Sequence, residues 1–256
     1  MFPISDHNPR LRWPVITALL IVANVAVWVL LQGFGAPRPL AASLCHWALI
    51  PGDLLGRLPA GLHIPVSNNL ACMIDGSSNP GTLLSSMFMH GGWLHIIGNM
   101  WFLWVFGDNV EDAMGRIRYA LFYLLSGLGA AAAQIATDPS SAVPMVGASG
   151  AIGGVMGAYA RCYPRARIDT VIFLGIIVTK VQVPAMVMLG YWFLLQLLGG
   201  LPSIGGGGAG GGVAFWAHIG GFATGLALSY LLLPPAALSD YRRRLQGDRS
   251  WSSRRF

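Results

Sequence analysis

Hydrophobic residues run along the chain in long stretches that contain no Asp, Glu, Lys or Arg. The five longest stretches are Trp13 to Pro37, Gly81 to Gly107, Tyr119 to Thr137, Pro139 to Ala160 and Val181 to Ser239. A helix needs about 20 apolar residues to cross a bilayer, so the last stretch is long enough for two crossings. The pattern predicts an all-α integral membrane protein with six transmembrane helices, near residues 13–34, 91–110, 117–137, 149–163, 183–199 and 214–234.

Two segments needed separate interpretation. Residues 168–181 are apolar but carry Asp169 and Lys180, so we place them at the surface and start the fifth span near Pro184, which suits the first turn of a helix. Residues 10–34 could be a signal peptide, but their apolar core is long and no convincing small-x-small cleavage site follows it, which favours an uncleaved first span.

Composition and charge support a membrane protein and suggest its orientation. The chain is 54% hydrophobic and 10% charged, whereas soluble domains are about 25% charged. Cationic residues collect on one face and only Arg38 and Arg57 lie on the other, so the positive-inside rule places both termini in the cytoplasm. Topology accounts for the net charge of +6 without a nucleic-acid partner. The predominance of Arg over Lys hints at a bacterial plasma membrane.

We therefore divide the chain into three parts. Residues 1–12 form a cytoplasmic N-terminal segment, 13–235 the membrane domain, and 236–256 a basic cytoplasmic tail. A long non-cytoplasmic loop, 35–80, contains Cys45 and Cys72. These cysteines either form a disulfide, as a bacterial periplasm would permit, or are two unrelated thiols.

Polar residues inside the spans are costly in a bilayer and are therefore candidates for function. Here they are His90, His95, Asn99, Ser149 and His218. The helix rise of about 1.5 Å per residue places Ser149, His95 and His218 roughly 18, 20 and 22 Å above the cytoplasmic edge, in one layer. By the same count the fourth helix is too short to cross the bilayer, so Ser149 is expected to open a helix at the floor of a water-accessible pocket.

Ser149 and His218 form a candidate nucleophile and base, since a serine hydroxyl needs a neighbouring base to take its proton. Glycines on both helices, among them Gly150 and Gly221, would let the two backbones approach closely. The Ser149 N–H, His95 and Asn99 could stabilise an oxyanion. No acidic residue is placed to act as a third member, so we predict a dyad.

Simpler explanations exist for each of these residues. A serine at a helix start is often only an N-cap, and glycine-rich helices often only pack. His90, His95 and His218 could bind a metal, but no H-E-x-x-H motif or acidic ligand accompanies them. A non-catalytic scaffold that binds transmembrane segments, or a transporter using a histidine proton relay, are alternative functions.

Three motifs resemble the signature blocks of the rhomboid intramembrane serine proteases. They are H-G-G-W-L-H-I-I-G-N from His90 to Asn99, G-A-S-G from Gly147 to Gly150, and A-H-I-G-G-F-A-T-G from Ala217 to Gly225. They fall on the second, fourth and sixth helices in the family's order, and the resemblance covers roughly residues 12–235.

The resemblance assigns a role to each matched residue. It implies Ser149 as nucleophile, His218 as general base, and His95 and Asn99 as oxyanion-stabilising residues. His90, Gly147, Gly150 and Gly221 would support them. Glu111 and Arg116, in a further matching pattern, would stabilise the cytoplasmic turn. The implied activity is cleavage of transmembrane protein substrates within the lipid bilayer, and no cofactor or metal is implied.

One position departs from the family's pattern. Many rhomboids carry an aromatic residue four positions after the nucleophile, packed against the catalytic histidine, and here that position is Gly153. Either another group such as Phe215 or Trp216 holds His218 in place, or the imidazole is held more loosely. By position, the loop 35–80 is a candidate for substrate docking and the loop 203–212 for capping the pocket.

Overall fold

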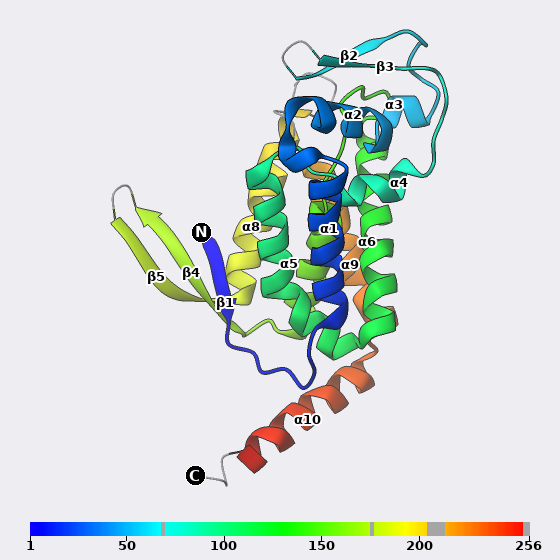
Figure 1. Cartoon of the computed structure of the whole chain (residues 1–256). Coiled ribbons are helices and arrows are strands. Elements are labelled where there is room, and N and C mark those ends of the chain that lie inside the picture. The colour runs from blue at the N-terminus through cyan, green and yellow to red at the C-terminus, as the bar shows by residue number, and fades with distance from the viewer. Residues whose placement is uncertain (68–69, 175–176, 204–212, 253–256) are drawn as a thin grey trace.

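A bundle of long helices forms the body of the molecule in the computed structural model, which describes residues 1–67, 70–174, 177–203 and 213–252 (Figure 1). A helix occupies each of the six segments for which the sequence predicts one. These helices are α1 (Val15–Leu30), α5 (Trp93–Met114), α6 (Arg116–Thr137), α7 (Ser149–Cys162), α8 (Ala185–Gly200) and α9 (Phe215–Leu232). The fifth begins directly after Pro184, as predicted.

Helix α7 is the centre of this bundle. It has 14 residues, about 21 Å of helix, and it packs against α5, α6 and α9. Its side chains are small or apolar, and nearly all of them are buried. Among the described helices, α6 and α9 are long and apolar enough to cross a membrane, while α1 and α8 are apolar but shorter. The bundle thus surrounds a short central helix that begins at Ser149.

Two small antiparallel sheets lie outside the bundle, and the prediction of an all-α chain did not include them. One has the order β1–β4–β5 and the other pairs β2 with β3. The strands are β1 (Phe2–Asp6), β2 (His63–Ser67), β3 (Leu70–Met73), β4 (Arg167–Leu174) and β5 (Ile177–Pro184). The surface segment 168–181 is therefore most of a hairpin, consistent with its content of Val, Ile and Thr.

Ion pairs fix the hairpin and the N-terminal strand to each other. Asp169 of β4 accepts from Lys180 Nζ at 2.7 Å and lies 2.9 Å from His7 Nε2. Hydrogen bonds from Lys180 and then from His7 lower the pKa of the Asp169 carboxyl well below its usual range. On the other side, the indole N–H of Trp101 in α5 donates to the Pro3 carbonyl at 2.6 Å. The N-terminal strand thereby joins the sheet to α5.

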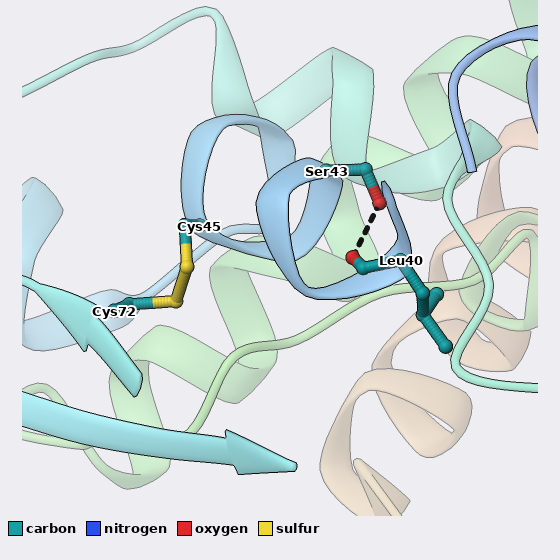
Figure 2. The surroundings of a disulfide bond; sticks show 4 residues. All are labelled: Leu40, Ser43, Cys45 and Cys72. Atoms are coloured by element: carbon teal, nitrogen blue, oxygen red, sulfur yellow. Dashed lines mark hydrogen bonds between the residues drawn. A yellow bond between two sulfur atoms is a disulfide. The ribbon is translucent and has the colours of Figure 1, made fainter. Parts of the chain in front are cut away.

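The loop 35–80 folds into a small cap at one end of the bundle (Figure 1). It contains η1 (Gly33–Gly35) at its start, α2 (Pro37–Trp47), α3 (Pro51–Leu54) and the β2–β3 hairpin, and α4 (Thr82–Ser85) and η2 (Ser86–Phe88) follow it. Cys45 of α2 and Cys72 of β3 are joined by a disulfide, which decides between the two alternatives left by the sequence (Figure 2). The bond holds the hairpin against α2.

The opposite end of the bundle carries both terminal segments. Helix α10 (Pro235–Ser252) follows α9 at this end. Helix α8 runs toward the end that carries the cap, and η3 (Leu201–Ser203) follows it there (Figure 1). Most of the loop proposed to cap the pocket, residues 204–212, lies outside the described residues. Glu111, expected to stabilise the cytoplasmic turn, accepts hydrogen bonds from the first turn of α1. Arg116 is exposed at the first residue of α6.

Candidate active site

Ser149 and His218 meet at the neighbouring N-terminal ends of two helices that pack side by side. Ser149 is the first residue of α7, and His218 lies in the first turn of α9. Their Oγ and Nε2 atoms are 2.7 Å apart, although the residues are separated by 69 positions in the sequence. This is hydrogen-bonding distance for a hydroxyl and an imidazole, so the serine proton has an acceptor in place.

Glycines make this approach possible. A β-carbon added at Gly221 of α9 would overlap the Gly150 carbonyl of α7, and one at Gly225 would overlap the Gly154 backbone one turn further along. The two helices therefore touch through their main chains. Gly221 is thus the position where α9 needs a glycine to approach α7. A β-carbon at Gly150 would instead meet the side chain of Ala130 on α6, 2.6 Å away.

Helix α8 supplies the groups that surround the His218 ring. The ring of Trp192 packs on the imidazole with centroids 5.9 Å apart. Gln196 Oε1 lies 2.8 Å from His218 Nδ1. At Gly153 a β-carbon would come within 2.9 Å of the His218 carbonyl, so the usual aromatic has no room there. An aromatic contact to the His218 ring comes from Trp192. The expected candidates were Phe215 and Trp216, and Trp192 was not among them.

His95 and Asn99 point at the backbone just before Ser149. A β-carbon placed on Gly147 would lie 2.6 Å from His95 Nε2 and 3.4 Å from Asn99 Nδ2. Gly147 has φ of +122°, a conformation that side chains rarely adopt, and its own N–H donates to Ser86 at 2.9 Å. Two side-chain donors and the N-terminus of α7 thus converge on one spot beside the serine hydroxyl.

The protonation of His95 can be inferred from its hydrogen bond. The N–H of Gly91 donates to His95 Nδ1 at 3.3 Å, so Nδ1 is an acceptor and the neutral ring carries its proton on Nε2. Asn99 Nδ2 is buried and has no hydrogen-bond partner among the described residues. Both groups therefore direct an N–H toward Gly147.

His90 is fully buried behind His95. The two rings contact edge to face with centroids 5.2 Å apart. Its backbone is clamped by Gln32, which accepts from the His90 N–H at 2.9 Å and donates to the His90 carbonyl at 2.8 Å. His90 thus packs behind His95, one of the candidate oxyanion residues.

A small pocket opens beside the serine. Its lining includes Gly127, Ala130, Ala131, Gly147 and Ala217, together with Ser149 itself. Larger apolar side chains, among them Met87 and Met145, complete the lining, so the space next to the hydroxyl is narrow and mostly apolar. It would accommodate a short side chain next to a carbonyl under attack.

Sequence reasoning missed Gln32, Trp192 and Gln196. Gln196 offered a signal, because it is a polar residue in the middle of an apolar predicted span, where polar groups are costly. Trp192 offered none, since aromatic residues are common in such helices. Which side chain of α8 reaches His218 depends on the rotation of that helix, which the sequence pattern alone does not determine.

Comparison with known proteins matches this chain to rhomboid proteins. The Rhomboid domain family model matches residues 78–235. RHOMBOID-like protein 4 of Arabidopsis thaliana is 31% identical over 88% of this chain and 54% of its own length. RHOMBOID-like protein 6, mitochondrial, of the same plant is 29% identical over 94% of this chain and 76% of its own length. Rhomboid protease GluP of Bacillus subtilis is 33% identical over 48% of this chain and 23% of its own length.

The matched region contains the Ser149–His218 pair, His95, Asn99 and the glycines that bring α7 and α9 together. The chain spans about half the length of the first of these relatives. With the family model covering most of the helical bundle, this chain belongs to the rhomboid family.

Proposed function

We propose that this protein is an intramembrane serine endopeptidase that hydrolyses peptide bonds in or near transmembrane segments. The observation that carries the proposal is the 2.7 Å contact between Ser149 Oγ and His218 Nε2, at the start of a helix whose preceding Gly147 faces His95 Nε2 and Asn99 Nδ2. Membership of a family that includes Rhomboid protease GluP supports it.

The geometry supports a two-step reaction. His218 Nε2 takes the Ser149 proton as Oγ attacks the substrate carbonyl carbon, and the carbonyl oxygen becomes an oxyanion. The Ser149 N–H, His95 Nε2 and Asn99 Nδ2 would donate to that oxyanion. His218 then protonates the leaving amine, and water hydrolyses the acyl-enzyme with His218 again acting as the base.

We also propose a topology in which the six helices α1, α5, α6, α7, α8 and α9 are the membrane segments. The membrane in this proposal is a bacterial plasma membrane. Both termini then lie in the cytoplasm, and the disulfide-linked cap lies on the opposite side of the membrane. The collection of Arg residues near one end of the bundle supports this orientation, and a disulfide in the cap is expected in an oxidising compartment.

The substrate is expected to be a transmembrane segment that unwinds readily. Glycine weakens a helix, whereas alanine is only small, and the pocket beside Ser149 admits only small side chains. We therefore propose small residues next to the cleaved bond. Water reaches the serine from the face that carries the cap.

The test is cleavage of a fluorescently labelled transmembrane peptide by the purified protein in liposomes. Wild type is expected to cleave it, and Ser149→Ala and His218→Ala are expected to be inactive. A fluorophosphonate probe should label wild type and not Ser149→Ala. Equal cleavage by wild type and Ser149→Ala would exclude the serine mechanism, and binding of the peptide without cleavage or labelling would favour a scaffold.

A further inference from the structure

We propose that Gln196 is a positioning residue for the base, so that the site operates as a Ser149–His218–Gln196 triad supplied by three helices. This inference rests on the proposed serine-protease function. It concerns Nδ1 of His218, the ring nitrogen that faces away from Ser149.

The amide of Gln196 has its orientation fixed on both sides. Its Nε2 donates to the Trp192 carbonyl at 3.3 Å, one turn back on the same helix. An amide nitrogen engaged in this way leaves Oε1 to face the imidazole, at 2.8 Å from Nδ1. An amide carbonyl oxygen can only accept a hydrogen bond, so Nδ1 must carry the proton.

This tautomer is the one that a general base requires. With the proton held on Nδ1, the lone pair of neutral His218 lies on Nε2, which faces Ser149 Oγ. As His218 takes the serine proton and becomes positive, the Gln196 carbonyl dipole still stabilises the Nδ1–H group. A neutral amide supplies part of what an aspartate supplies in soluble serine proteases, without placing a full charge at membrane depth.

The burial of Gln196 argues for a specific role. It is 9% exposed, whereas its neighbours Leu194 and Leu195 are 51% and 44% exposed. A glutamine in an apolar helix would be costly if its amide were unsatisfied, and here both ends are used on Trp192 and His218. The buried amide of Gln196 on α8 thus serves as the partner of His218 Nδ1.

A consequence is that α8 must be seated against α9 for the base to be aligned. Trp192 packs on the ring and Gln196 holds Nδ1, and both come from α8. The aromatic prop that the sequence lacks at position 153 is thereby replaced from a different helix. Movement of α8 away from α9 would remove both supports together.

The test compares Gln196→Leu with Gln196→Glu and with Leu195→Met, an exposed neighbour, as the matched control. Gln196→Leu is expected to lower kcat about 10- to 100-fold with KM and thermal stability unchanged. Gln196→Glu keeps the acceptor and should restore most of the turnover. A Gln196→Leu variant with wild-type kcat would overturn the proposal. So would the same loss of kcat in Gln196→Leu and Gln196→Glu, accompanied in both by the same fall in melting temperature.

A second measurement does not depend on cleavage. Nitrogen-15 chemical shifts of the histidines in detergent, with the His218 signal identified by its loss in His218→Asn, report which ring nitrogen is protonated. We expect the Nδ1–H form in wild type and in Ser149→Ala, and a mixture of tautomers in Gln196→Leu. The same tautomer in Gln196→Leu would contradict the positioning role, whereas absence of peptide cleavage by wild type would contradict only the proposed function.

Discussion

Glu111 accepts two hydrogen bonds from Thr17, one from its backbone N–H and one from its hydroxyl, both at 2.8 Å. A third comes from the Ile16 N–H at 2.9 Å. A buried carboxylate of α5 therefore caps the first turn of α1, where the helix leaves N–H groups without partners and favours negative charge. The contact connects the first and second predicted spans at their shared end.

Glu111→Gln should destabilise the fold by about 1–3 kcal/mol, because the amide is uncharged and offers only one oxygen to three donors. The midpoint of thermal unfolding in detergent measures the effect. Asp240→Asn removes an exposed carboxylate that pairs with Arg243 and should leave the midpoint unchanged. An unchanged midpoint in Glu111→Gln would refute the capping role.

Gly221→Ala should separate the nucleophile from the base. The added methyl group overlaps the Gly150 carbonyl, so α9 must shift from α7, at a cost of about 1–3 kcal/mol. We expect fluorophosphonate labelling of Ser149 to slow at least tenfold, since a 1 Å misplacement can cost about a hundredfold in rate. Gly190→Ala is the matched control, because a β-carbon there meets no atom within 4 Å.

Asn99→Ala should lower turnover about 10² to 10³-fold with little change in KM, as expected for a donor that acts on the oxyanion. His95→Ala should behave in the same way, because its Nε2 points to the same position. The measurement is steady-state cleavage of the labelled peptide. A raised KM with unchanged kcat would assign these side chains to substrate binding instead.

Asp6 makes the N-terminal strand sensitive to pH. Burial, reinforced by the charge of Asp108, raises the pKa of its carboxyl from 3.8 to about 6, despite hydrogen bonds from Tyr159 and Asn8. The folded state therefore holds the proton more tightly than the unfolded state. This stabilisation, up to about 3 kcal/mol, is complete below pH 3.8 and is lost as the pH rises through 6.

Asp6→Asn should remove this contribution. The difference in unfolding midpoint between wild type and Asp6→Asn is expected to change between pH 4 and 7, in the direction that favours wild type at the acidic end. Chemical denaturation at a series of pH values measures it. A difference that does not vary with pH would show that Asp6 titrates alike in both states.

Loss of the disulfide should loosen the cap and leave the helical bundle intact. The bond joins residues 27 positions apart, and the chain-entropy model assigns about 3.5 kcal/mol to a loop of that size. Cys45→Ala with Cys72→Ala should speed proteolysis within the β2–β3 hairpin. Cys162→Ala, which removes a buried free thiol, should leave the hairpin as resistant as wild type.

The sequence predicted the helices and the site residues because both depend on local signals. Charge-free stretches locate α1 and α9, and the helix rise counted from the ends of the spans puts Ser149 and His218 at a similar depth. Asp169 and Lys180 placed the residues of the β4–β5 hairpin at the surface, but the pairing of these strands with each other and with β1 was not predicted, because it depends on contacts that the segment alone does not reveal. The pairing of Cys45 with Cys72 and the support of His218 by Gln196 depend on tertiary arrangement, which no single segment encodes.

The main-chain contact between α7 and α9 has a consequence for how such a sequence can vary. The spacing of nucleophile and base is fixed by the contact of two backbones, so repacking of other side chains cannot compensate for a change at Gly221 or Gly225. Positions such as Leu231, 74% exposed on the same helix, carry no such constraint. Saturation mutagenesis of α9 should therefore separate into an intolerant face and a freely exchangeable one, and the boundary would trace the seam between the helices.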